Sequence, residues 1–134
     1  VADVVELVAL APTILDAADE EPHPGMQGES LWPHLAGEGS REKDTAYCEF
    51  YNSSTQHTDP KAYATMLRTD RYKLVATHDA DEPGELYDLE SDPEETTNRW
   101  TDPDYLDVKA RLLDRLAERM ARTADPLPER QSPW

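Results

Sequence analysis

The fold is decided by the stretch AYATMLRTDRYKLVAT, which spans residues 62–77. Its two ends, 62–68 and 72–77, are rich in aromatic and β-branched residues, which favour β-strands. Only Thr69, Asp70 and Arg71 separate them, and three residues is a common length for a hairpin connection. We therefore expect two antiparallel strands joined by a tight turn.

Two further strands are expected on either side of this hairpin. The runs AYCEFY at 46–51 and ELYDL at 85–89 have the same short, aromatic-rich character. The turn sequence SDPE at 91–94 stops the last of them. Together these runs predict a four-stranded antiparallel meander.

A C-terminal helix should cover one face of this sheet. Thr101 and Asp102 offer helix caps, and Pro103 suits the first helical position. Apolar side chains then recur at three- and four-residue steps, namely Tyr105, Val108, Leu112, Leu116 and Met120. The expected fold class is α+β, a four-stranded sheet packed against this helix.

The N-terminal segment 3–18 (DVVELVALAPTILDAA) shows a second helical pattern. Its apolar positions lie on one face, namely Val4, Leu7, Val8, Ala11, Ile14, Leu15 and Ala18. Pro12 lies inside this pattern, so we expect either a kink or a helix that begins near Ala11. Loop residues follow at 19–30, and 31–35 form a short apolar turn.

The charge of the chain excludes several classes of function. Its 134 residues include 29 acidic and 13 basic side chains, which gives a net charge of −16. Such a surface repels the phosphates of nucleic acids and anionic membranes. The longest apolar stretch is too short to cross a bilayer. We expect a soluble, cytoplasmic protein, and the excess of carboxylates is typical of proteins from high-salt organisms.

Several short motifs occur in a fixed order along the chain. They are APTIL at 11–15, MQGESL at 26–31, MLRT at 66–69 with YKL at 72–74, and ELYDL at 85–89 with DPE at 92–94. In this order and spacing the chain resembles the C-terminal part of a type I sulfatase, an arylsulfatase-like member of the alkaline-phosphatase superfamily. The likeness runs from Val5 to Met120. Ala9 and Asp19 depart from it, because the family often has Asp and Gly there.

This resemblance implies that the catalytic N-terminal domain is missing from the sequence. In the family, that domain supplies a formylglycine, made from a Cys/Ser-x-Pro/Ala-x-Arg motif, and a divalent cation, Ca²⁺ or Mg²⁺. Cys48 is followed by Glu49-Phe50-Tyr51, with Phe50 in the Pro/Ala position, so it does not match the motif, and Ser91-x-Pro93 has Glu95 in the Arg position. We therefore expect no catalytic residue, metal ligand or cofactor in this chain.

The resemblance also implies a domain division. Residues 1–44 would end the sulfatase core with their helix and linker, 45–124 would form the C-terminal subdomain, and 125–134 would be a tail. In the family, loops of this subdomain can overhang the catalytic pocket. The longest irregular stretch between the expected strands is 52–61, and His57 within it is the candidate substrate contact.

The other histidines and the basic residues have simpler interpretations. The four histidines lack the spacing of a zinc site, so we expect them at the surface. Arg68, Arg71 and Lys73 form the only basic cluster. We expect them to bind carboxylates across the sheet rather than an anionic sulfate.

Two functions are compatible with these features. The chain is either the subdomain of a sulfuric ester hydrolase, docked on a catalytic domain, or a free-standing acidic interaction module that has kept the fold without the chemistry. The helix at 3–18 separates them. A subdomain without its partner should expose the apolar face of this helix or pair it with a second copy, whereas a free module should cover it.

The charge leads to a first prediction, that folding is favoured by salt. At low ionic strength the carboxylates repel one another, and this repulsion is screened within about 3 Å at about 1 M salt. The melting temperature should therefore rise from dilute buffer to about 1 M KCl. A melting temperature that stays constant across this range would contradict the assignment to a high-salt environment.

Overall fold

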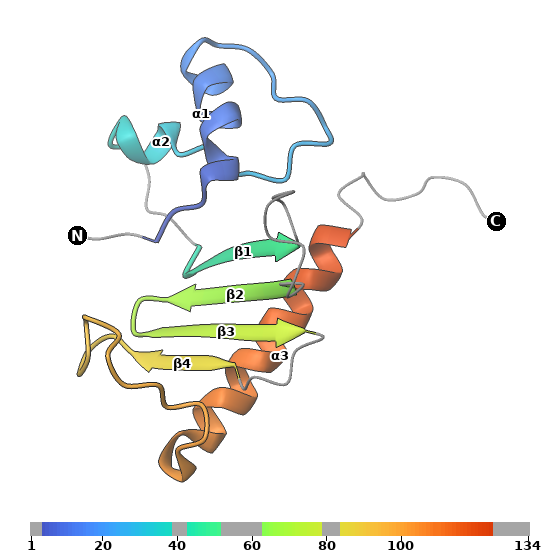
Figure 1. Ribbon diagram of the computed structural model, residues 1–134. Coiled ribbons are helices and arrows are strands. Elements are labelled where there is room, and N and C mark those ends of the chain that lie inside the picture. The colour runs from blue at the N-terminus through green and yellow to red at the C-terminus, as the bar shows by residue number, and fades with distance from the viewer. Residues whose placement is uncertain (1–3, 39–42, 52–62, 79–83, 125–134) are drawn as a thin grey trace, which may run out of the picture.

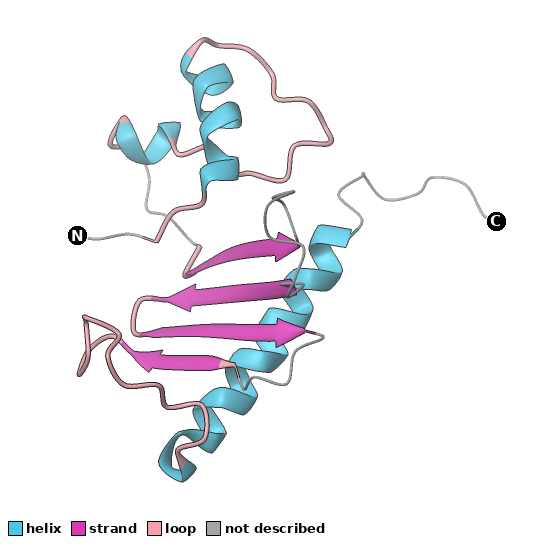
Figure 2. Ribbon diagram, viewed as in Figure 1, coloured by secondary structure: helices cyan, strands magenta, loops and turns pink. Residues whose placement is uncertain are grey.

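Four antiparallel strands form one sheet in the order β1-β2-β3-β4 (Figures 1 and 2). The computed structural model describes residues 4–38, 43–51, 63–78 and 84–124. Within them the strands are β1 (Thr45–Tyr51), β2 (Tyr63–Thr69), β3 (Tyr72–His78) and β4 (Glu85–Asp88). The meander predicted from the sequence is confirmed.

The central hairpin has the register that its apolar pattern requires. Leu67 of β2 lies opposite Leu74 of β3, so both point to the same face of the sheet. Between the two strands, the Thr69 hydroxyl oxygen accepts a hydrogen bond from the backbone N–H of Tyr72 at 2.8 Å. The side chain of Thr69 thus closes a turn that lacks the usual Asn-Gly pair.

A long helix lies across one face of the sheet, as Figure 1 shows. This helix is α3 (Leu106–Ala124), and a short 3₁₀ turn, η2 (Pro103–Tyr105), leads into it. Asp102 caps the turn, because its side chain accepts a hydrogen bond from the Asp104 N–H at 3.0 Å. Of the predicted caps, Asp102 is confirmed, as is the position of Pro103, but both belong to the 3₁₀ turn, and α3 itself begins at Leu106.

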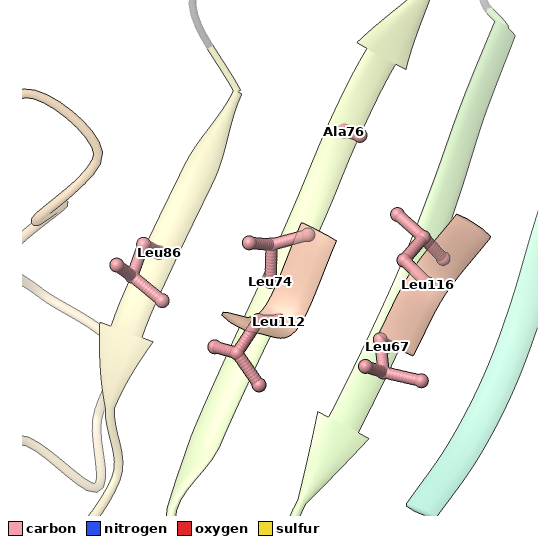
Figure 3. Packing of buried hydrophobic residues seen from close by; sticks show 6 residues of the cluster. All are labelled: Leu67, Leu74, Ala76, Leu86, Leu112 and Leu116. Atoms are coloured by element: carbon pink, nitrogen blue, oxygen red, sulfur yellow. The ribbon is translucent and has the colours of Figure 1, made fainter. Parts of the chain in front are cut away.

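The hydrophobic core lies between the sheet and α3. Alternate residues of the strands point toward the helix, and Leu67, Leu74 and Leu86 have no exposed surface. Leu112 and Leu116 lie one turn apart on α3 and contact these three leucines (Figure 3). The core of this part of the chain is thus one layer deep.

The outer edge of β4 is covered by the segment that follows it. The side chain of Asn98 donates to the carbonyl of Gly84 at 3.1 Å and accepts from the N–H of Leu86 at 3.0 Å. The Arg99 N–H then donates to the carbonyl of Leu86 at 2.7 Å. These bonds satisfy backbone groups that would otherwise offer an edge for pairing with another chain.

The N-terminal residues 4–38, which we call the arm, lie beyond the β1 edge of the sheet (Figure 1). The arm contains η1 (Leu7–Ala9), α1 (Leu10–Ala17) and α2 (Trp32–Leu35). Of the two expectations for the segment 3–18, the helix that begins near Ala11 is confirmed, because α1 starts at Leu10 and a short 3₁₀ turn precedes it. The reason is Pro12, which fits the first turn of a helix because its missing N–H needs no partner there.

Within the described residues, no helix combines the length and the apolar character that crossing a membrane requires.

The core leads to a second prediction. Replacing Leu112 or Leu116 with Ala removes buried methyl groups and leaves a cavity under the sheet. Each change should lower the free energy of unfolding by about 2–5 kcal/mol. Leu106, on the same helix, is 52% exposed, so Leu106→Ala is the matched control and should have a small effect. Urea unfolding of the three variants measures this. Equal effects would show that α3 is not packed on the sheet.

Candidate functional site

The arm exposes apolar side chains that no described part of the chain covers. Leu7, Leu10 and Ile14 are 86%, 52% and 68% exposed. Their spacing of three and four residues places them on one side of the η1–α1 segment, and we call this side the arm face. Trp32 and Leu35 of α2 are exposed as well. The apolar face predicted from the sequence is therefore not packed within this part of the chain.

The packed side of the arm is a different one, and it is centred on Thr13. Pro12 and Thr13 are buried, as is Ala9. The Thr13 hydroxyl donates to the carbonyl of Ala9 at 2.6 Å and accepts from the N–H of Leu31 at 2.8 Å. One hydroxyl group therefore joins α1 to the segment that leads into α2.

A glycine allows the arm to fold back on itself. A Cβ atom added to Gly28 would lie 2.1 Å from the carbonyl oxygen of Val8, closer than any side chain can approach. Two residues later, the Ser30 hydroxyl donates to the carboxylate of Asp16 at 2.5 Å. The QGES part of the motif at 26–31 therefore closes the arm and holds α1 in place.

A buried carboxylate connects the arm to the sheet and to α3. Glu6 precedes η1 and is 7% exposed. Its carboxylate accepts from the N–H of Tyr47 in β1 at 2.6 Å and from Arg119 in α3 at 2.9 Å. Lys43, in the linker before β1, also binds it, at 2.5 Å. Glu6 therefore determines how the arm is oriented relative to the rest of the chain.

Glu6 is ionised in this setting. Burial opposes ionisation, but the hydrogen bonds from Lys43 and from the Tyr47 N–H, together with the charges of Lys43 and Arg119, outweigh it. The pKa of Glu6 is therefore held below its ordinary value. Because the ionised form is the one that binds these partners, the Glu6 carboxylate makes all of these contacts at neutral pH.

The arm meets the far end of α3 at one further point. The side chain of Gln27 donates to the carbonyl of Thr123 at 3.0 Å, which satisfies one of the free carbonyls at the end of the helix. A shallow depression of about 420 Å³ lies between the arm, β1 and α3. Glu6 and Arg119 are in its wall, but they bind each other. The depression therefore offers no free charge from this pair to a ligand.

The described residues hold no group of three or more His, Cys, Asp or Glu side chains placed to bind a metal ion. Cys48 is exposed on β1. His57, the predicted substrate contact, lies outside the described residues, and it remains a prediction. His23 and His34 are exposed, as expected. His78 is not a plain surface residue, because its Nε2 lies 2.8 Å from the hydroxyl of the buried Thr65.

The basic cluster binds carboxylates, as predicted for two of its three members. Arg71 makes two hydrogen bonds to Asp88, at 2.9 and 2.8 Å, and Lys73 pairs with Glu95. Asp88 is 2% exposed. The hydrogen bonds from Arg71 lower the pKa of Asp88, although the burial of Asp88 acts in the opposite direction. A hydrogen bond from the hydroxyl of Tyr105 lowers it further. Arg68 is exposed on β2.

Sequence reasoning missed the two buried carboxylates, Glu6 and Asp88. Glu6 interrupts the apolar stretch 4–15. Its signal was this very position, because a charged residue inside an apolar run needs an internal partner if the run is buried. Asp88 could have been suspected from the alternation of ELYDL, in which it shares a face with the buried Leu86.

Comparison with known families gives a match over nearly the whole chain. The family described as "N-sulphoglucosamine sulphohydrolase, C-terminal" matches residues 1–122. The chain is 31% identical, over 91% of its length, to an N-acetylglucosamine-6-O-sulfatase of Bacteroides thetaiotaomicron, of which it covers 22%. A protein of Haemophilus influenzae is 27% identical over 93% of the chain, and 61% of that protein is covered.

A solved structure shows the same arrangement. The phosphonate monoester hydrolase of Agrobacterium radiobacter is similar over 92% of the chain, with a TM-score of 0.74 and 28% identity. The chain covers 26% of that enzyme. It thus spans about a quarter of the hydrolases that it resembles, and about three fifths of the H. influenzae protein.

The tie at Glu6 leads to a third prediction. Glu6→Gln leaves Lys43 and Arg119 without their common carboxylate, and at pH 7 it should lower the free energy of unfolding by at most about 3–5 kcal/mol. The folded-state pKa of Glu6 is depressed, so its contribution is present above its ordinary value of 4.5 and is lost as the pH falls through the folded-state value.

The difference between wild type and Glu6→Gln should therefore shrink in acid. Urea unfolding at neutral pH and at several values below 4.5 measures this. The control is Glu21→Gln, at an exposed position of the arm, which should cost little at any pH. An equal difference at all pH values would contradict the role of the ionised carboxylate.

Proposed function

The chain belongs to the family of N-sulphoglucosamine sulphohydrolase C-terminal domains, and on this basis we propose that it is the non-catalytic C-terminal subdomain of a sulfuric ester hydrolase. It is homologous to sulfatases over 91% of its length but spans only 22% of the Bacteroides enzyme. The proposed role is structural. The subdomain docks on the catalytic part of the enzyme and stabilises it.

The observation that carries this proposal is the arm face. Leu7, Leu10 and Ile14 are exposed on a segment that is held in place by Thr13, Gly28 and Glu6. Leaving such a face in water is unfavourable by about 25 cal/mol per Å² of apolar surface. A rigid segment that presents its apolar side outward is typical of a surface that meets a partner.

In this proposal the chemistry comes from the rest of the enzyme. The formylglycine and the divalent cation expected for a sulfatase belong to the catalytic part, and this chain contributes neither. His57 would face the substrate from the rim of the pocket. His57 lies between β1 and β2 in the sequence. β1 ends and β2 begins at one end of the sheet, and β3 ends and β4 begins at that same end.

A free-standing acidic module is the second candidate, and one observation favours it. The chain covers 61% of the H. influenzae relative, so this subdomain also occurs in a protein much shorter than the hydrolases. In that case the arm face would bind another protein or a second copy of the chain. The two candidates differ in whether the chain is needed for ester hydrolysis.

The fourth prediction tests this difference with the full-length protein that contains the chain. We expect the full-length protein to hydrolyse an aryl sulfate or the 6-O-sulfate of N-acetylglucosamine, and the isolated chain to hydrolyse neither, with or without Mg²⁺ or Ca²⁺. Ile14→Asp should lower the melting temperature of the full-length enzyme and leave that of the isolated chain unchanged, because this side chain is uncovered only in the latter.

One control and one further variant accompany this experiment. Asp19→Asn, at an exposed polar position of the same arm, should change neither melting temperature. His57→Ala should alter kcat or KM of the full-length enzyme if His57 faces the substrate, and unchanged values would remove it from the rim. Turnover by the isolated chain that vanishes on mutating one of its own residues would overturn the proposal.

A further inference from the structure

The sheet has a second face, and a row of apolar side chains crosses it among charged and polar ones. Side chains alternate along each strand, so the residues between the core positions point away from α3. The middle row of this face is apolar on three strands, because Cys48 lies opposite Met66 and Met66 lies opposite Val75, and it ends at Glu85 of β4. The neighbouring row contains Phe50, opposite Ala64. We call this surface the open face.

No described helix or strand covers the open face. Figure 1 shows α3 on the other side of the sheet and no labelled element on this one. Phe50 is 40% exposed and Cys48 is exposed, while Met66 and Val75 are half-buried. In an antiparallel sheet with one face toward water, the outer positions are usually polar. The apolar row therefore indicates a missing layer.

The arginine beside this row, Arg68, also indicates a partner surface. Arg68 lies on the open face, between Ala46 of β1 and Lys73 of β3. Lys73 pairs with Glu95. Arg68 is exposed and makes no ion pair with any carboxylate of the described residues, although the chain carries 29 acidic side chains. A guanidinium that no carboxylate of the described residues pairs with is available to a carboxylate of a partner.

We propose that the open face is a second docking surface, covered in the complete enzyme by the part of the sulfatase that this chain lacks. The partner surface would be apolar opposite Met66 and Val75 and would carry a carboxylate opposite Arg68. This inference rests on the proposed function, and it adds that the sheet, and not only the arm, contacts the catalytic part.

Two observations favour this occupant over a second copy of the chain. The chain spans 26% of the hydrolase from A. radiobacter and 22% of the Bacteroides sulfatase, so a partner several times its size belongs to the same molecule. A second copy would instead bring a further net charge of −16 against the first, which is repulsive at ordinary ionic strength.

Cys48 provides a probe of this surface, because it is the only cysteine of the chain and lies in the apolar row. Its thiol should react with a maleimide at the rate of a free thiol in the isolated chain. In the full-length protein, read at this peptide by mass spectrometry, labelling should be slower by about tenfold or more. A cysteine introduced at the exposed Glu118 of α3, in the Cys48→Ser background, serves as a comparison position.

The variant Arg68→Glu tests the proposed contact between Arg68 and a carboxylate of the partner surface. This change should lower the melting temperature of the full-length protein by several degrees and leave that of the isolated chain unchanged, because the partner carboxylate is present only in the former. The control is Arg111→Glu, an exposed arginine of α3, on the side of the sheet away from the open face.

The outcomes separate the two proposals. Fast labelling of Cys48 in a full-length protein that Ile14→Asp destabilises would overturn the open face as a docking surface and leave the arm face intact. Protection of Cys48 in the isolated chain that increases with protein concentration would identify a second copy as the occupant, which would also overturn this inference. Protection in the full-length protein alone supports it.

Discussion

The arrangement of this chain depends on one buried carboxylate. Glu6 binds the backbone of β1, Arg119 of α3 and Lys43 of the linker, so it joins the arm to the sheet and to the helix at a single point. A carboxylate with three donors is held in position far more firmly than an apolar contact of the same size would be, because each bond has a preferred direction. The direction in which the arm face points follows from this geometry.

The same use of charge recurs at the other end of the sheet. Asp88 is buried and binds Arg71 of the central hairpin and Tyr105 of η2, which leads into α3. In a chain with 29 carboxylates and 13 cations, these arginines and lysines are bound internally and hold separate elements together. The remaining carboxylates dominate the surface. Within the described residues, the arm face and the open face expose apolar side chains on this acidic surface.

Much of the fold could be predicted from residue patterns. The strands, the C-terminal helix and the buried positions Leu112 and Leu116 agree with the structure within a residue or two. These elements follow local rules, namely a period of two along strands, a period of 3.6 along helices and the capping preferences of Asp102 and Pro103. The candidate site was predicted less well. The exposed helix face was anticipated, whereas Glu6, Asp88 and the apolar character of the open face were not.

The sequence by itself determined the four strands, the C-terminal helix and which residues of α3 face the core, because these properties depend on neighbours within a few residues. Only the tertiary structure decided that Glu6 is buried, because its partners Lys43, Tyr47 and Arg119 lie 37, 41 and 113 residues away. It also decided which apolar side of the arm is packed and which is exposed. Periodicity shows that a face is apolar, but only the placement of other elements determines whether that face is covered.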